Sequence, residues 1–187
     1  MKEKFLEKLK YEYNYSDLTI NGYDYEITKF LDYLNDNHLD YKKINLDMIR
    51  NYLKYLDSLK YKKNSISKNL SSLRSFYKFL TEEKVILNNP FKNISNPKKD
   101  KKLPDFLNYE EINKLFDSAD TTTPLGLRNR CILELLYDTG IRVSELVNLK
   151  INDIEFDKKI INILGKGKKE RIVYYGDYLQ EVLDKYI

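Results

Sequence analysis

Hydrophobic residues recur at helical spacing over three stretches in the first half of the chain. The first, 16–36, opens with the helix-start pair Ser16-Asp17, and the second covers 45–59. The third begins at Ser65, a good N-cap. Its apolar residues lie at i, i+4, i+7, i+11 and i+14: Ile66, Leu70, Leu73, Tyr77 and Leu80. This pattern predicts three amphipathic helices that can share one core.

The opposite side of the third predicted helix is polar and basic. It carries Lys68, Ser71, Ser75 and Lys78. Short serines between lysines let a phosphate chain approach the backbone closely, and such a helix face suits a DNA groove. An ordinary solvated face explains the same residues, so both interpretations stay open on the pattern alone.

The segment "NNPFKNISNPKKDKKLP" at 88–104 interrupts the helical periodicity. It holds three of the four prolines and no sustained hydrophobic repeat, which is typical of an interdomain linker. The chain is therefore predicted to consist of a helical domain (1–90), a linker (91–104) and a second domain (105–187).

The second domain changes its hydrophobic period along its length. Helices are expected from Tyr109, over 127–138 and over 144–149, and Gly140 can take the left-handed conformation that ends the middle one. The β-branched and aromatic runs "IEFDKKIINIL" and "RIVYY" then flank "GKGKKE", which predicts a hairpin before a final helix. The expected fold class is mainly α with a small antiparallel β-sheet.

Composition excludes several kinds of chemistry. Cys131 and His38 are the only residues of their types, which removes intramolecular disulfides, Cys-rich or His-rich metal sites and the usual Ser-His catalytic pairs. No apolar run approaches the ~18 residues of a membrane span, and the N-terminus is too acidic and broken for a secretory signal. We expect a cytoplasmic protein that uses no metal or cofactor and does not bind membranes.

The net charge of +4 is unevenly distributed. Ten Lys or Arg face three Asp or Glu between Asp40 and Leu80, whereas 12 basic residues face 15 acidic ones from Leu103 onward. A basic middle region on a nearly neutral protein suggests a polyanionic partner. A solvated lysine-rich surface accounts for the same counts, and charge alone does not decide between them.

One arginine stands at a glycine-marked helix junction. In "DTGIRVSELVNLKINDI" (138–154), Arg142 follows the Thr139-Gly140 break and precedes Ser144, a helix-start residue. A guanidinium held rigidly at such a junction can bind two oxygens of one phosphate. Alternatively, Arg142 pairs with Glu134 or Glu145 and locks the turn.

Four blocks of the sequence together resemble the tyrosine recombinase family of the Xer and phage-integrase type. They are "LSSLRSFYKFL", the 88–104 segment, "RNRCILELLYDTGIRVSELVNLKINDI" and "ILGKGKKERIVYY", and they occur in the family's order. The most specific part is the TG-[IL]-R-x-S-E-L turn followed by a GKGxKxR hairpin. The resemblance implies a helical SAM-like core-binding domain followed by a partial α+β catalytic domain, both clamped around double-stranded DNA.

The resemblance also implies a metal-free reaction and assigns two catalytic residues. A tyrosine attacks a phosphodiester, forms a 3′-phosphotyrosyl link and frees a 5′-hydroxyl, and a strand from a second duplex reverses the step. Arg142 would stabilise the charge on the non-bridging oxygens, and Lys166 in the hairpin would protonate the leaving 5′-oxygen. Lys168 and Lys169 suit the loop equally on chemistry, and only the resemblance selects Lys166.

We expect DNA contacts from Lys68, Arg74 and Lys78 of the third helix and from Arg171 after the hairpin. Arg74 flanks the apolar stripe and could instead brace the domain, and Arg171 could support the loop. In the complete enzyme, other recombinase protomers would join this one in a tetramer on DNA.

The family pattern continues with a His-x-x-Arg pair, a further His or Trp and the nucleophilic tyrosine, and none of these follows Arg171 in the 187 residues. The chain is therefore expected to be a DNA-binding fragment that stops before the second half of the catalytic domain and is inactive alone. One alternative is a non-catalytic DNA-binding module that competes for recombination sites. Another is a helical interaction protein with no nucleic-acid role.

Overall fold

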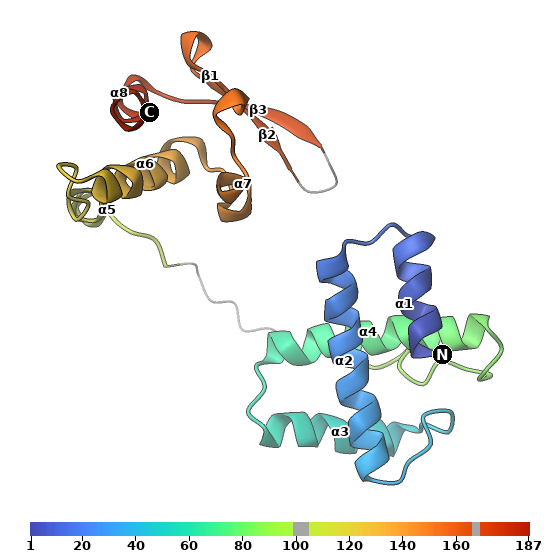
Figure 1. The fold of residues 1–187 in the computed structure, drawn as a ribbon. Helices are drawn as coiled ribbons and strands as arrows, with labels where there is room; N and C mark the ends of the chain where they lie inside the picture. The colour runs from blue at the N-terminus through green and yellow to red at the C-terminus, as the bar shows by residue number, and fades with distance from the viewer. Residues whose placement is uncertain (99–104, 166–168) are drawn as a thin grey trace. The chain divides into compact units, whose positions relative to one another are not determined.

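The computed structural model describes residues 1–98, 105–165 and 169–187 (Figure 1). Contacts within the chain divide it into two compact units, Met1–Leu103 and Pro104–Ile187, which are described separately. No helix among the described residues is long and apolar enough to cross a membrane.

The first unit is built from helices α1 (Lys2–Tyr11), α2 (Asp17–Asp36), α3 (Leu46–Ser58) and α4 (Lys63–Glu82). The hydroxyl of Ser16 accepts a hydrogen bond from the Thr19 backbone and caps α2, and Asn45 caps α3 in the same way. The predictions for α2 and α3 are thereby confirmed.

Two predictions for the first unit were incomplete or wrong. Helix α1 was not predicted, because only Phe5 and Leu9 of its ten residues are buried and two positions make a weak periodic signal. Helix α4 begins at Lys63 after an N-cap at Lys62, so Ser65 lies inside the first turn and does not cap the helix.

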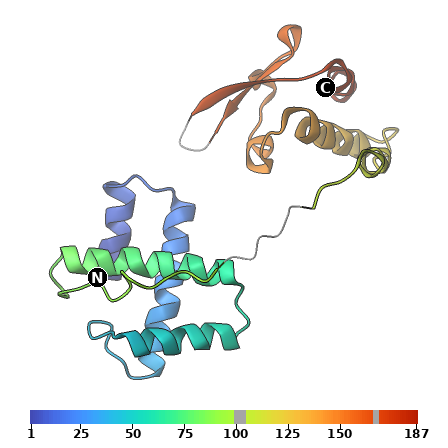
Figure 2. The ribbon, with the colours of Figure 1, turned by 180° about the vertical axis from the view of Figure 1, so that it is seen from behind.

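Helix α4 is the centre of the first unit and packs against both α1 and α2 (Figures 1 and 2). Its apolar stripe is buried as predicted, and rings from other elements close around it. Phe91 is fully buried, with its ring centroid 4.9 Å from that of Tyr77 and 5.6 Å from that of Phe30. The beginning of the segment expected to be a linker therefore packs into the core of this unit.

The second unit combines helices with a small sheet. Its helices are α5 (Tyr109–Asp117), α6 (Pro124–Thr139), α7 (Val143–Val147) and α8 (Asp177–Tyr186). The strands β1 (Ile154–Glu155), β2 (Ile160–Leu164) and β3 (Glu170–Tyr174) form an antiparallel sheet in the order β1-β2-β3. The expected fold class, mainly α with a small antiparallel sheet, is confirmed.

The apolar run 154–164 does not form one continuous strand. A 3-10 turn at Phe156–Lys158 interrupts it, and Lys159 follows with a φ of 51°, so the chain reverses between β1 and β2. The strands β2 and β3 pair from Ile160 opposite Tyr174 to Leu164 opposite Glu170, as the hairpin prediction requires.

The core of the second unit lies between α6, α8 and one face of the sheet. Its buried members are Cys131, Leu135, Ile141, Ile161, Ile163, Tyr175, Leu179, Val182 and Leu183. Gly140 has a φ of 60° and ends α6 in the predicted left-handed conformation. The chain then turns, Ile141 enters the core, and Arg142 follows as the N-cap of α7.

Candidate functional site

Arg142 is the N-cap residue of α7 and is held by its neighbours on both sides. Gly140 supplies the turn before it, and Ile141 anchors the backbone with only 4% of its surface exposed. The Arg142 side chain, in contrast, is 67% exposed. The fold thus fixes the base of this side chain and leaves its guanidinium accessible to solvent.

The carboxylate of Glu145 lies beneath Arg142 and accepts four hydrogen bonds. Its Oε2 accepts from the Arg142 backbone N–H at 2.8 Å, and its Oε1 accepts from Arg142 Nη1 at 2.9 Å. Arg171 donates from Nη1 to Oε1 and from Nη2 to Oε2, both at 2.8 Å. The Glu145 side chain is only 5% exposed, so a buried carboxylate joins α7 to strand β3.

These hydrogen bonds keep the cluster charged at neutral pH. The Arg171 hydrogen bonds, followed by the one from the Arg142 backbone N–H, hold the pKa of the Glu145 carboxyl well below its usual range. The hydrogen bond to Glu145 in turn raises the pKa of Arg171. Two guanidiniums and one carboxylate leave one net positive charge, and the exposed member of the cluster is Arg142.

Arg142 uses only part of its hydrogen-bonding capacity on the protein. Its backbone N–H and Nη1 bind Glu145, and no described residue accepts a hydrogen bond from its Nε or Nη2. The structure therefore combines the two interpretations of this arginine: it pairs with Glu145, and it still presents free donors to an anion. Its partner is Glu145 and not Glu134, which pairs with Arg130.

Lys166, the predicted catalytic lysine, lies outside the described residues. The residues at the base of its hairpin are described: the Gly165 backbone N–H donates to the Lys169 carbonyl at 2.7 Å. A Cβ on Gly165 would lie 3.2 Å from that carbonyl oxygen and 3.4 Å from Arg171 Nη1. A glycine is therefore suited to this position because the hairpin backbone passes close to the Glu145 cluster.

The basic face of α4 is accessible in the first unit. Lys68 and Lys78 are exposed as the helical pattern predicts, and Ser71 lies between them. The Lys68 ammonium lies 3.5 Å from the point where a Cβ on Gly22 would stand, so α2 and α4 are close together there. A shallow cavity of about 350 Å³ opens at this place, lined by Leu18, Thr19, Gly22, Tyr23, Lys68, Ser71 and Ser72.

Arg74 contacts the protein itself. Its Nε donates to the Phe91 carbonyl at 3.2 Å, and its Nη2 donates to the Ile94 carbonyl at 2.8 Å and to Asn96 Oδ1 at 3.3 Å. These contacts fit the bracing role considered for Arg74 beside the expected DNA contact. They hold the segment after α4 against that helix.

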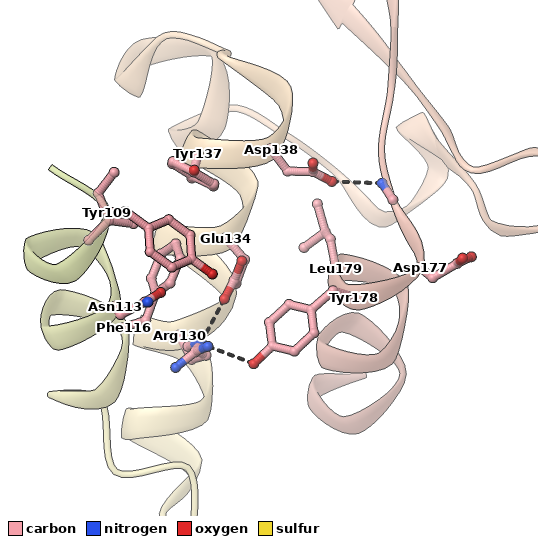
Figure 3. A pocket seen from close by; sticks show the side chains of 12 residues that line it. Tyr109, Asn113, Phe116, Arg130, Glu134, Tyr137, Asp138, Asp177, Tyr178 and Leu179 are labelled. Atoms are coloured by element: carbon pink, nitrogen blue, oxygen red, sulfur yellow. Dashed lines mark hydrogen bonds and ion pairs between the residues drawn. The ribbon is translucent and has the colours of Figure 1, made fainter. Parts of the chain in front are cut away.

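A further cavity of about 450 Å³ lies between α5, α6 and α8 (Figure 3). Arg130 at its base packs against the rings of Phe116 and Tyr178 and donates to Glu134 Oε1 at 2.8 Å and Tyr178 Oη at 2.6 Å. Asp138 accepts from the Gly176 backbone N–H at 2.7 Å. The residues of the Glu145 cluster, Arg142, Glu145 and Arg171, do not line this cavity. Arg130, Glu134 and Asp138 do line it, and each already has a hydrogen-bond partner within the protein.

Glu145 is the residue whose role the sequence did not reveal. It appeared only as one of two alternative partners for Arg142, and its contact with Arg171 spans 26 positions. The available signal was its place three residues after the N-cap, where a Glu side chain reaches back to the backbone of the cap. No group of three or more His, Cys, Asp or Glu side chains suited to a metal ion occurs in 1–98, 105–165 or 169–187.

Comparison with known protein families covers both units. A family described as "Phage integrase family" matches residues 105–187. Another, "Phage integrase, N-terminal SAM-like domain", matches residues 3–84. Each match falls within one of the two compact units.

The chain is 43% identical over all of its 187 residues to tyrosine recombinase XerC of Staphylococcus aureus strain N315 and covers 63% of that protein. Among solved structures, XerH recombinase in a post-cleavage complex with palindromic difH substrate has a TM-score of 0.72 at 25% identity, covering 98% of this chain and 55% of that one. The Tn1549 transposon integrase in complex with circular intermediate DNA has a TM-score of 0.73 at 16% identity, covering 98% and 63%, which shows a shared fold. The chain thus spans less than two thirds of the length of the curated relatives it matches.

Proposed function

Because this chain belongs to the phage integrase family of tyrosine recombinases, we propose that it acts in site-specific DNA recombination. Its two units would bind one duplex as a core-binding domain and as the first part of a catalytic domain. The reaction proposed for the complete protein is metal-free cleavage and rejoining through a 3′-phosphotyrosine, which needs no high-energy cofactor because the bond energy is kept in the protein–DNA link.

The observation that carries this proposal is the exposed Arg142 guanidinium on a buried carboxylate. Transfer of a phosphoryl group develops charge on the non-bridging oxygens, and preorganised donors stabilise that charge without rearranging during the step. The free Nε and Nη2 donors of Arg142 can bind these oxygens while Glu145 holds the rest of the side chain. Lys166 completes the proposal as the proton donor to the leaving oxygen, on the strength of the resemblance alone.

DNA contact by the first unit is proposed for the exposed face of α4. Lys68 and Lys78 lie ten residues apart on α4 and are both exposed, as is Ser71 between them. Arg74 was also expected to touch DNA, and this stays a prediction, although its Nη2 donates to the Ile94 carbonyl. Arg171 was expected to touch DNA as well, but both of its terminal nitrogens donate to Glu145, which favours a role within the protein. A tetramer on DNA and a cytoplasmic location remain predictions as well.

We further propose that this chain binds DNA without cleaving it. The sequence holds one histidine, His38, which lies in the first unit, and no His-x-x-Arg pair follows the hairpin. A non-catalytic module that competes for recombination sites is the second candidate function, and it requires neither Arg142 nor Lys166. The two candidate functions predict different rates of strand cleavage after substitution of Arg142 in a complete recombinase: the first predicts a large reduction and the second predicts no change.

The binding part of the proposal is tested with Lys68→Glu/Lys78→Glu in a fluorescence anisotropy titration on duplex DNA at several salt concentrations. We expect weaker binding and a flatter salt dependence, with the slope reduced by about 1 for each phosphate that is no longer neutralised. Lys54→Glu/Lys185→Glu makes the same charge change at exposed positions outside this face and is expected to retain most of the slope. Equal effects of the two pairs would exclude α4 from the interface, and no duplex binding at low salt would support a protein without a nucleic-acid role.

The catalytic part is tested with Arg142→Ala in a complete recombinase that contains this chain. Removal of one preorganised donor to a developing oxyanion costs roughly 10²–10³-fold in rate, so strand cleavage should fall by about that factor. Duplex affinity should stay within a few-fold of the unsubstituted protein. Undiminished cleavage would reject the role of Arg142 and favour the competitor module.

A further inference from the structure

We propose that Arg171 is a positioning residue for Arg142 and acts through the carboxylate of Glu145 instead of binding a DNA phosphate itself. The identity of the anion that Arg142 binds rests on the proposed function. The positioning does not, because it is a property of the DNA-free protein.

The geometry of Arg171 matches a carboxylate clamp. Its two terminal nitrogens donate to different oxygens of Glu145, both at 2.8 Å, and this fork fixes the plane of the carboxylate as well as its position. The Arg171 side chain is 37% exposed, but both Nη atoms are engaged on the protein. A phosphate contact by the same fork would require it to release a buried carboxylate.

Arg142 depends on the orientation that this clamp sets. Each Glu145 oxygen accepts one bond from Arg171 and one from Arg142, so rotation of the carboxylate would break both sets together. Among the described residues, Glu145 is the only hydrogen-bond partner of the Arg142 guanidinium. Because that guanidinium is 67% exposed, no burial restrains it in place of the hydrogen bond.

Charge gives a second reason for this arrangement. A carboxylate paired with Arg142 alone would neutralise it, and the pair would attract an anion weakly. With Arg171 balancing Glu145, the one uncompensated positive charge remains on Arg142. A phosphodiester carries one negative charge, so the cluster as a whole matches one backbone phosphate.

Lysine cannot replace Arg171 in this role. An ammonium is a point charge on a flexible stem and does not present two parallel donors to the two oxygens of a carboxylate. Arg171→Lys therefore keeps the charge of the cluster and removes the geometric clamp. Arg128→Lys is the matched control, since Arg128 is exposed on α6 and, among the described residues, its side chain hydrogen-bonds only to the adjacent Asn129.

The test is ¹⁵N NMR of the Arg142 guanidinium in the DNA-free chain, which reports exchange of its N–H protons with water. We expect Arg171→Lys to accelerate this exchange roughly tenfold, since a charge-assisted hydrogen bond loses its fixed acceptor. A pH titration of the Glu145 carboxyl ¹³C signal should show that its pKa rises toward the usual range in Arg171→Lys. Arg128→Lys should change neither quantity.

Unchanged Arg142 exchange in a folded Arg171→Lys protein would overturn the inference. If that variant does not fold, Arg171→Gln, whose amide donates to one carboxylate oxygen, serves in its place with the same two outcomes.

Duplex binding separates this inference from the proposed function. A positioning role predicts that Arg171→Lys lowers duplex affinity no further in the Arg142→Ala background, whereas a direct phosphate-binding role predicts a further reduction from the lost bidentate contact, which would count against the inference.

Discussion

Both units bury carboxylates beside cations, and Glu26 of the first unit and Glu145 of the second differ in the number and exposure of their partners. In the first unit, Glu26 is 5% exposed and accepts from the Asn69 amide at 3.0 Å, with Lys29 at 3.5 Å. Lys29 is itself largely covered, with its ammonium 4.3 Å from the ring centroids of both Tyr25 and Tyr61. In the second unit, Glu145 is equally buried, but it is served by two arginines and one of these is two-thirds exposed.

The difference separates a packing element from a binding site. Glu26 has one enclosed cation, so its charge is balanced inside the protein and nothing is left for a ligand. Glu145 has two cations, and the surplus charge lies on the exposed one. A buried carboxylate therefore indicates function only when its partners outnumber it and one of them faces solvent. The following predictions test this contrast from the largest expected effect to the smallest.

Lys29→Met should lower the free energy of unfolding of the first unit by about 3 kcal/mol, because it leaves Glu26 buried without its cation. Urea unfolding followed by the NMR amide signals of each unit measures this, and the second unit should be unaffected. Lys54→Met, at an exposed position of α3, is the control and should change the free energy by less than about 0.5 kcal/mol. Equal effects of the two substitutions would show that Glu26 and Lys29 do not form a structural pair.

Acid should destabilise the second unit through Glu145. Its pKa is lowered in the folded state, so at intermediate pH the unfolded chain, with a pKa near 4.3, binds more protons. The stabilising contribution is complete well above that value and is lost as pH falls below about 4.5 toward the folded pKa.

Thermal unfolding of the second unit between pH 7 and pH 3 measures this contribution. Glu145→Gln should be less stable at pH 7 and should show a smaller decline over this range than the unsubstituted protein. Identical pH profiles of the two proteins would contradict the assignment of a charged, clamped Glu145.

The smallest effect on folding is expected at the exposed cation Lys78. Its ammonium lies 3.7 Å from Glu82 in a pair whose side chains are 75% and 44% exposed, and such surface pairs contribute about 0–1 kcal/mol. Lys78→Ala should change the free energy of unfolding by less than about 0.5 kcal/mol while weakening duplex binding. A larger drop in stability would make Lys78 a structural residue and remove it from the proposed interface.

Local patterns predicted the elements whose signals lie within a few residues. Ser16 and Gly140 mark helix ends that the structure reproduces, because a cap depends on one side chain or one backbone conformation. The same reasoning placed Ser65 as a cap, although the helix begins at Lys63. The hydrophobic pattern does not distinguish a helix that begins at Ser65 from one that begins two residues earlier.

The site was predicted only where chemistry and local sequence coincide. The turn around Arg142 is a local feature, so its rigid base followed from Gly140 and the helix start, whereas the exposure of its guanidinium did not follow from the pattern. The clamp between Arg171 and Glu145 joins a strand to a helix 26 residues away, and hydrophobic periodicity contains no information on such a pair. The packing of Phe91 was hidden for another reason: a single ring in a Pro- and Lys-rich segment looks like part of a linker.

The central claim is that the free side of Arg142 binds one backbone phosphate of duplex DNA. The most direct measurement combines Arg142→Ala with a series of duplexes, each of which carries a neutral methylphosphonate at one backbone position, and determines the affinity of this chain for every combination. The account predicts one position at which the few-fold reduction caused by Arg142→Ala disappears once the phosphate is neutral, because each change removes the same interaction. Additive reductions at every position would show that Arg142 binds no phosphate and would contradict the account.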